Sequence, residues 1–299
     1  MKAIIFGASG QDGYYLKRII EKSSGNVVAV SRSIKNGLQG DVANYDFVEQ
    51  LIRQHEPDFI FHFAANSTTS HSALFENHQT ISSGTLNILE AVSRHSKKTR
   101  VFISGSGLQF VNHGSAIDEF EKFEARDPYS ISRIQSVYAA RYYRSLGLQV
   151  YVGYFFNHDS ALRSARHINQ KIASAANNIA QGSKEVLEIG NPDVRKEFTF
   201  AGDTMQAVWK LVNNKADVFE AVIGSGKDYS IIDWLTICFE MKGLKWKDHV
   251  KMSEGFKADY GILVSNPHTL VALGWKQAVE IEELASMMLN NIVDAKETV

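Results

Sequence analysis

Tyr129 and Arg133 are the two residues of this chain whose types and spacing best suit acid–base chemistry. Residues four apart share one face of a helix, so the guanidinium can lie beside the phenol. A fixed cation there stabilises the phenolate and lowers the pKa of tyrosine, normally about 10, toward neutrality. Ser106 ends a preceding apolar stretch and offers a hydroxyl that can orient the reacting oxygen. We therefore predict a catalytic group of Ser106, Tyr129 and Arg133.

A glycine turn with the spacing G-x-x-G-x-x-G directly follows the first apolar run, Ala3 to Phe6. Glycine allows a tight turn, and it lets backbone N–H groups approach a pyrophosphate at the positive end of the next helix. The turn therefore predicts dinucleotide binding. The residues expected along the cofactor here are Gly7, Ser9, Gly10, Gln11, Asp12 and Gly13.

The residues after the second apolar run, 26–30, indicate which dinucleotide binds. A site selective for NAD offers Asp or Glu to the ribose hydroxyls about 20 residues after the first glycine. This chain has Arg32 there, and an arginine can pair with the 2′-phosphate of NADP. We predict NADP, with NAD as the alternative if Arg32 is only an exposed loop residue. Asp41 and Val42 are candidates for contact with the adenine.

Alternating elements position these residues. Continuous apolar runs predict buried strands at 3–6, 26–30, 58–63, 101–103 and 150–155, and helical periodicity predicts helices at 15–20, 47–52, 81–92 and 129–144. Strict alternation predicts an α/β fold with a doubly wound parallel sheet of Rossmann type. Ligands bind such sheets at the carboxyl ends of the strands.

The alternation weakens after residue 156, which predicts a smaller C-terminal α/β lobe that binds substrate. We expect helices at 165–181, 204–212, 231–240 and 281–293, and strands at 186–189 and 221–223. The expected division is an NADP-binding domain of residues 1–158, completed by about 198–224, and a substrate-binding lobe of residues 159–197 and 225–299.

Composition describes a soluble globular protein. The 299 residues include 32 basic and 33 acidic side chains, interspersed, so no nucleic-acid partner is expected. The apolar run near Met1 is too short for a membrane span or a signal peptide. Cys238 is the only cysteine, which favours a reducing, cytoplasmic location, and the histidines lack metal-site spacing, so no metal is expected.

Several segments together resemble the extended short-chain dehydrogenase/reductase superfamily, also called the NAD-dependent epimerase/dehydratase family, and within it the GDP-mannose 4,6-dehydratases. The resemblance covers nearly the whole chain. The glycine turn carries the more specific pair Gln11-Asp12, and Asn157-His158 is similar to a second signature of these enzymes. The segments that carry the resemblance are residues 7–16, 63–67, 155–160, 190–197 and 273–275.

The resemblance implies a role for each matching residue. It implies that Ser106 and Tyr129 are catalytic, and that two long helices, here 74–92 and 129–144, form a homodimer or homotetramer. Residues implied along the cofactor are Phe63, Ala64, Ala65, Ser67, Tyr129, Arg133 and Phe156. Residues implied to contact a GDP-sugar or related nucleotide sugar are Ser106, Gly107, Leu108, Asn157, Lys171, Lys196 and Lys257. Apolar residues that could join the two helix pairs, or equally belong to the core, are Ile131, Ile134, Val137 and Tyr138.

Three departures from the family pattern affect the expected reaction. Arg133 stands for a lysine, and Lys196 and Lys257 stand for arginines, so these positions keep their charge. Leu108 stands for the acidic residue that removes a proton during elimination, and leucine cannot take a proton.

We therefore expect an oxidoreductase acting at C4 of a nucleotide-diphosphate sugar, such as a GDP-hexose, deoxyhexose or heptose. It would be a 4-keto reductase or a 4-dehydrogenase. Two alternatives stay open. The first is a GDP-mannose 4,6-dehydratase with a relocated acid from Asp118, Glu119 or Glu121, and the second is a catalytically silent, cofactor-binding partner of an active relative.

Overall fold

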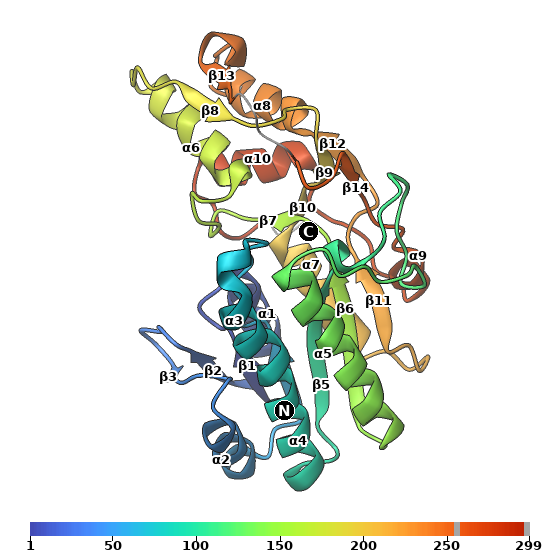
Figure 1. The fold of residues 1–299 in the computed structure, drawn as a ribbon. Coiled ribbons are helices and arrows are strands. Elements are labelled where there is room, and N and C mark those ends of the chain that lie inside the picture. The colour runs from blue at the N-terminus through green and yellow to red at the C-terminus, as the bar shows by residue number, and fades with distance from the viewer. Residues whose placement is uncertain (254–257, 296–299) are drawn as a thin grey trace.

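The computed structural model describes residues 1–253 and 258–295, and its centre is a parallel sheet of seven strands (Figure 1). The strand order is β11-β6-β5-β4-β1-β2-β3, and every pairing in it is parallel. This order contains the doubly wound order 3-2-1-4-5-6, so the predicted fold class is confirmed. The strands are β1 (Lys2–Phe6), β2 (Asn26–Ser31), β3 (Leu38–Gln39), β4 (Phe59–His62), β5 (Arg100–Ser106), β6 (Gln149–Phe155) and β11 (Glu220–Ile223).

Helices cover both faces of the sheet because its strands are apolar on both sides. One face, with Ile5 and Phe61, packs against α1 (Gln11–Lys22) and α7 (Ala201–Val212). The opposite face, with Ile4 and Ile60, packs against three further helices. These are α2 (Tyr45–His55), α4 (Gly84–His95) and α5 (Pro128–Ser145).

The remaining elements gather beyond the carboxyl edge of the sheet, in the upper part of Figure 1. Their helices are α6 (Ile168–Ala180), α8 (Ile231–Glu240) and α10 (Ile281–Leu289), while the short α9 (His268–Ala272) lies lower, next to β11. Their strands form small sheets, β12-β9-β14, β13-β8 and β10-β7. The bounds are β7 (His158–Asp159), β8 (Leu187–Ile189), β9 (Arg195–Glu197), β10 (Thr199–Phe200), β12 (Asp228–Ser230), β13 (Val250–Met252) and β14 (Ile262–Leu263).

One apolar cluster joins this upper part to the sheet. It contains Tyr15 of α1, Phe200 of β10, Trp234 of α8 and Leu284 of α10. The expected C-terminal lobe is therefore present as a set of packed elements with a shared core, and the domain boundaries stated above stay a prediction. In the described ranges, no helix has the length and apolar character needed to cross a membrane.

Three expected helices differ in their ends. The helix expected at 81–92 begins earlier, as α3 (Leu74–Asn77) and a π-helical turn (His78–Ser83), and continues into α4. The helix expected from 165 begins at Ile168, because the residue before it, His167, has an extended backbone with φ −86° and ψ 137°. The last helix ends at Leu289 and not at 293, because the chain turns at Asn291, whose φ of 53° is left-handed.

Val137 is a core residue and not a surface residue of the expected dimer face. It is fully buried in the apolar cluster on the α5 side of the sheet, while Tyr138, next to it, is 58% exposed. A helix that packs on a sheet must bury one stripe, and Val137 lies in that stripe. Ile131 is exposed and Ile134 is half-buried.

Candidate active site

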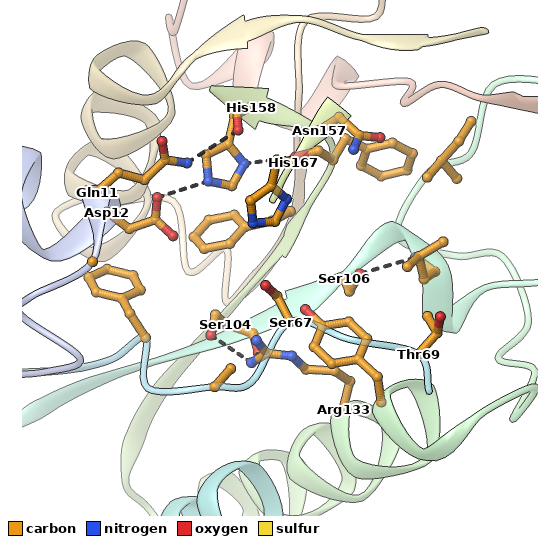
Figure 2. A pocket seen from close by; sticks show the side chains of 18 of the residues that line it. Gln11, Asp12, Ser67, Thr69, Ser104, Ser106, Arg133, Asn157, His158 and His167 are labelled. Atoms are coloured by element: carbon orange, nitrogen blue, oxygen red, sulfur yellow. Dashed lines mark hydrogen bonds and ion pairs between the residues drawn. The ribbon is translucent and has the colours of Figure 1, made fainter. Parts of the chain in front are cut away.

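A cleft lies between the carboxyl edge of the sheet and the upper part of the molecule (Figure 2). The ends of β4, β5 and β6, the glycine turn and the start of α5 supply its floor and walls, and residues after β6 supply its roof. Its lining residues are Gly10, Gln11, Asp12, Phe63, Ala65, Ser67, Thr69, Ser104, Ser106, Leu108, Tyr129, Arg133, Phe155, Phe156, Asn157, His158, Arg163, His167, Tyr260 and Leu263. Most of the predicted site residues therefore meet in one place.

The glycine turn has the geometry of an anion cradle. Gly7 has a φ of 87°, and a Cβ on it would lie 2.6 Å from the nitrogen of Ala64. A Cβ on Gly13 would lie 2.5 Å from the Cα of Ala8, so packing within the protein explains both of these glycines. Gly10 differs, because its Cβ would meet only the carbonyl oxygen of Gly7, at 3.4 Å. Gly10 faces the cleft at the amino end of α1, where a bound pyrophosphate requires close approach. The turn therefore fits a dinucleotide.

Helix α5 brings the tyrosine and the arginine to the cleft. Asp127 caps it by accepting hydrogen bonds from the backbone nitrogens of Tyr129 and Ser130, and Pro128 occupies its first turn. The guanidinium carbon of Arg133 lies 5.0 Å from the centre of the Tyr129 ring. Arg133 is almost fully buried and donates through Nη1 to the hydroxyl of Ser104, at 2.7 Å. The cation is thus fixed beside the tyrosine.

Ser106 and Leu108 form the wall next to this pair. The hydroxyl of Ser106 accepts a 3.2 Å hydrogen bond from the backbone nitrogen of Leu108, and both residues line the cleft. Gln109 turns away and accepts a hydrogen bond from the Ser106 backbone nitrogen at 2.8 Å. The position two residues after Ser106 therefore places an aliphatic side chain in the wall of the cleft.

Two polar motifs that are far apart in sequence contact each other above the glycine turn. The two ring nitrogens of His158 lie 2.9 Å from Asp12 Oδ1 and 2.8 Å from the carbonyl oxygen of Phe156. Both oxygens can only accept, so the imidazole carries both protons. Burial alone would lower the pKa of His158, but the charge and hydrogen bond of Asp12 outweigh it and raise that pKa. Burial would raise the pKa of Asp12, and His158 lowers it instead.

Eight lining residues were not among the predicted site residues. Phe155 and His158 belong to a segment that carries the resemblance, and the other six are Thr69, Ser104, Arg163, His167, Tyr260 and Leu263. Arg163 and His167 lie in the segment between β7 and α6, which carries no recognisable spacing. Arg163 pairs with Asp159 at 3.2 Å. The pKa of His167 is lowered to about 4, because the ring is partly buried and the charge of Arg163 is close by. The His167 imidazole is therefore uncharged near pH 7.

A second cavity adjoins the cleft, and Tyr260 lines both. Lys171 and Lys196 line this second cavity. The ammonium group of Lys171 donates to the carbonyl oxygen of Glu188 at 2.7 Å. Burial lowers the pKa of Lys196 to about 8. Lys257 lies outside the described residues.

The residues predicted for the adenosine end lie apart from both cavities. Arg32 pairs with Glu76 at 3.0 Å, and the other oxygen of Glu76 accepts a hydrogen bond from Asn66. Ser9 bonds to Ser31 at 2.7 Å, which links the glycine turn to the end of β2. Asp41 accepts from the backbone nitrogen of Ala43. Val42 is buried next to Gly84, whose added Cβ would touch it.

The three acids proposed as replacements for residue 108 do not line the cleft. Glu119 is buried, accepts from the hydroxyl of Thr269 and lies 3.8 Å from His268. Asp118 and Glu121 each accept a hydrogen bond from a nearby backbone nitrogen in their own loop. Of the described residues that line the cleft, Asp12 is the only carboxylate, and it is paired with His158.

Fold and site together define an extended short-chain dehydrogenase/reductase: a doubly wound sheet, a glycine turn, a Tyr-x-x-x-Arg face on α5 and a further set of elements over the cleft. A family model described as GDP-mannose 4,6 dehydratase matches residues 4–288. The chain belongs to the GDP-mannose 4,6-dehydratase family, which confirms the resemblance and the prediction of an enzyme of this class.

Individual proteins agree with this assignment. GDP-mannose 4,6 dehydratase 1 of Arabidopsis thaliana is 26% identical over 321 residues, covering 96% of this chain and 88% of the relative. The structure of dTDP-glucose 4,6-dehydratase from Bacillus anthracis in complex with NAD superposes with a TM-score of 0.84 at 15% identity, covering 97% of this chain and 96% of that one. RMD from Pseudomonas aeruginosa complexed with NADPH gives 0.84 at 19% identity, with the same coverages. Because their sequence identities to this chain are low, these two structures show only that the fold is shared.

Proposed function

We propose that this enzyme moves hydride at C4 of a nucleotide-diphosphate sugar and does not eliminate the C6 hydroxyl. The nicotinamide of a bound dinucleotide would supply the hydride acceptor or donor. Tyr129 takes the proton from the C4 hydroxyl, or returns it to the C4 carbonyl, and Ser106 orients that oxygen. Arg133, fixed on Ser104, keeps a positive charge 5.0 Å from the centre of the Tyr129 ring.

The observation that carries this proposal is the aliphatic side chain of Leu108 in the wall of the cleft, next to Ser106. Elimination needs a group that takes a proton from carbon and helps the hydroxyl to leave. Leucine does neither, and the only lining carboxylate among the described residues, Asp12, is engaged by His158. The part of the cleft that the structure describes thus has the residues proposed for hydride transfer, and its one carboxylate, Asp12, is not free for elimination.

The second cavity supports a nucleotide diphosphate as the far end of the substrate. Lys171 and Lys196 bring two cations to it, and Asn157 lines the adjoining cleft. Cations are suited to phosphate oxygens. The Arabidopsis relative is named for GDP-mannose, so we propose a GDP-sugar.

We propose NADP as the cofactor, because Arg32 follows β2 where a 2′-phosphate would lie. The ion pair between Arg32 and Glu76 must open before Arg32 can contact a 2′-phosphate. The preference for NADP over NAD therefore depends on whether the Arg32 guanidinium binds the phosphate more strongly than it binds the Glu76 carboxylate. We also propose a cytoplasmic homodimer through α3–α4 and α5. Exposed apolar residues on these helices support it, namely Phe75, Leu86, Ile131, Tyr138 and Tyr142.

Mass spectrometry of the products tests the reaction. Purified protein is incubated with GDP-mannose and, separately, with its 4-keto-6-deoxy derivative, each with oxidised or reduced NADP. Gain of two hydrogens by the keto sugar, or their loss from GDP-mannose, is the expected result. Loss of one water from GDP-mannose would overturn the proposal in favour of a dehydratase. No change with either sugar, despite measurable cofactor binding, would overturn the assignment of GDP-sugars.

A further inference from the structure

His167 is the titratable residue in the roof of the cleft that nothing above explains. It precedes α6, where its carbonyl oxygen accepts from the nitrogen of Lys171 and its own nitrogen donates to Ser164. Its backbone is therefore held by the start of a helix. Figure 2 shows its ring reaching into the cleft on the side opposite Ser67 and Ser106.

The other titratable groups around the cleft are already engaged. Asp12 and His158 pair with each other, Arg133 bonds to Ser104, and Arg163 pairs with Asp159. Tyr260 is hydrogen-bonded by Asn157. Among the described titratable residues that line the cleft, only Tyr129 and His167 have neither a hydrogen bond nor an ion pair through their side chains. They approach from opposite parts of the molecule.

The charged neighbours of His167 keep its imidazole neutral. Arg163, Arg166 and Lys196 disfavour a second proton on the ring, and Asp159 opposes them more weakly than burial and Arg163 together. A neutral imidazole has one nitrogen that can accept a proton and one that can donate. It is thus poised as a base of about the strength of an ordinary carboxylate.

We propose that His167 is an acid–base residue that exchanges the proton on a carbon next to the C4 carbonyl of the bound sugar, an inference that rests on the proposed function. Oxidation at C4 makes the neighbouring C–H bonds acidic. The C–H bond breaks, its proton moves to the free imidazole nitrogen, and its electron pair moves into the carbonyl to give an enolate. Ser106 and Tyr129 supply hydroxyl groups to the enolate oxygen. The reverse step returns a proton to carbon, so no further reactant is needed.

His167 exchanges a proton at carbon only; departure of the C6 hydroxyl needs in addition a group that protonates that hydroxyl, and Leu108 in the wall of the cleft cannot do so. The wall and floor residues Ser106 and Tyr129 act on the oxygen at C4, whereas His167 acts on a carbon beside it. One site then carries out hydride transfer at C4 and proton exchange at the next carbon. The two steps depend on different residues and can be measured separately.

The test is solvent deuterium exchange into a 4-keto sugar that is supplied already oxidised, as its GDP derivative and in a parallel series as its UDP derivative. The full-length protein with bound cofactor is incubated in heavy water, and mass spectrometry measures deuterium at carbon. Hydride transfer is followed separately by the absorbance of the reduced nicotinamide. The variants are His167→Phe, which keeps ring size, and His167→Gln, which keeps hydrogen bonding but does not shuttle protons.

We expect deuterium uptake with the wild-type enzyme, and a roughly 100-fold or greater loss in both variants, because general acid–base groups contribute about that much. Hydride transfer should fall much less than deuterium uptake in both variants, whereas a purely structural role for His167 would lower the two rates together. The matched control is His249→Phe, a histidine that stacks on Phe239 away from the cleft. Unchanged exchange in the variants, or no exchange in the wild type, would overturn the proposal. Exchange without hydride transfer would refute the proposed function and leave His167 as the base.

Discussion

Asp12 of the glycine turn and His158 of the segment after β6 form a partly buried ion pair, with Oδ1 and Nε2 2.9 Å apart. Gln11 makes a parallel link, since its side-chain nitrogen donates to the carbonyl oxygen of His158 and its oxygen accepts from Ser160. The cofactor turn is therefore fastened directly to the segment that begins the roof of the cleft. The segments Gln11-Asp12 and Asn157-His158, which carry the resemblance in sequence, are therefore in direct contact.

The ion pair predicts how stability depends on pH. The pKa of His158 is raised above its ordinary 6.5, so its contribution is complete below that pH and is lost as the pH rises through the folded value. The pKa of Asp12 is lowered from 3.8, so its contribution is present above that pH and is lost on further acidification. We expect the melting temperature to be highest between these limits. Melting curves across the pH range measure this.

The matched variants are His158→Gln and Asp12→Asn. Each should destabilise the fold by roughly 3 kcal/mol, because it leaves one buried charge without its partner, and the double variant should cost less than the sum. The loss of stability on the alkaline side should disappear in His158→Gln. An alkaline loss equal to that of the wild type would show that His158 is not the titrating group.

Tyr129→Phe should lower kcat by about 10²–10⁴-fold, since it removes the acid–base hydroxyl and keeps the ring under Arg133. Cofactor binding, measured by fluorescence titration, should change little. The control is Tyr138→Phe, an exposed tyrosine of the same helix, which should retain full activity. A Tyr129→Phe enzyme with an unchanged rate would favour the silent-partner alternative.

Gly10 and Gly7 should respond differently to alanine. Gly10→Ala should leave the melting temperature almost unchanged, because its backbone is extended and a Cβ there meets no atom closer than 3.4 Å. It should weaken cofactor binding by about tenfold or more, a loss of roughly 1.4 kcal/mol. Gly7→Ala should destabilise the fold by at least about 1–2 kcal/mol, the cost of a left-handed alanine. Calorimetry measures both effects, and an equal loss of stability in the two variants would contradict the assignment of Gly10.

Leu108→Glu should introduce slow elimination, because it adds a carboxylate to the wall of the cleft beside Ser106. The expected product is GDP-mannose that has lost the mass of one water. Leu108→Gln has the same size without the proton transfer, and should give none. Elimination by the glutamine variant, or by the wild type, would mean that residue 108 does not control this step.

Lys196 predicts a pH-dependent KM. Its pKa is lowered to about 8 by burial, so its positive charge, and with it the attraction to a diphosphate, is lost as the pH rises through that value. We expect the KM of the nucleotide sugar to rise above about pH 8 in the wild type and to stay flat in Lys196→Arg, which remains charged. Lys196→Met should raise KM by about tenfold or more at neutral pH. A KM for Lys196→Arg that rises with pH as in the wild type would assign the titration elsewhere.

Local sequence patterns are enough to predict the sheet, the glycine turn and the helix that carries Tyr129 and Arg133. These features depend on local patterns: apolar runs, glycine spacing and i, i+4 positions, which act over a few residues. The family signatures also identified the segments that meet at the cleft. Helix ends were less accurate, as at Ile168 and Leu289, because capping and packing decide where a helical pattern stops.

Only the tertiary structure decided which side chains are available for chemistry. It joined Asp12 to His158 across 146 residues and removed both from the set of free acids and bases. In the folded chain Arg32 forms an ion pair with Glu76, and the His167 side chain has no partner among the described residues in the roof of the cleft. The reason is physical: the protonation and reactivity of a side chain depend on burial and on neighbouring charges, and those neighbours come from elements that are distant in the chain.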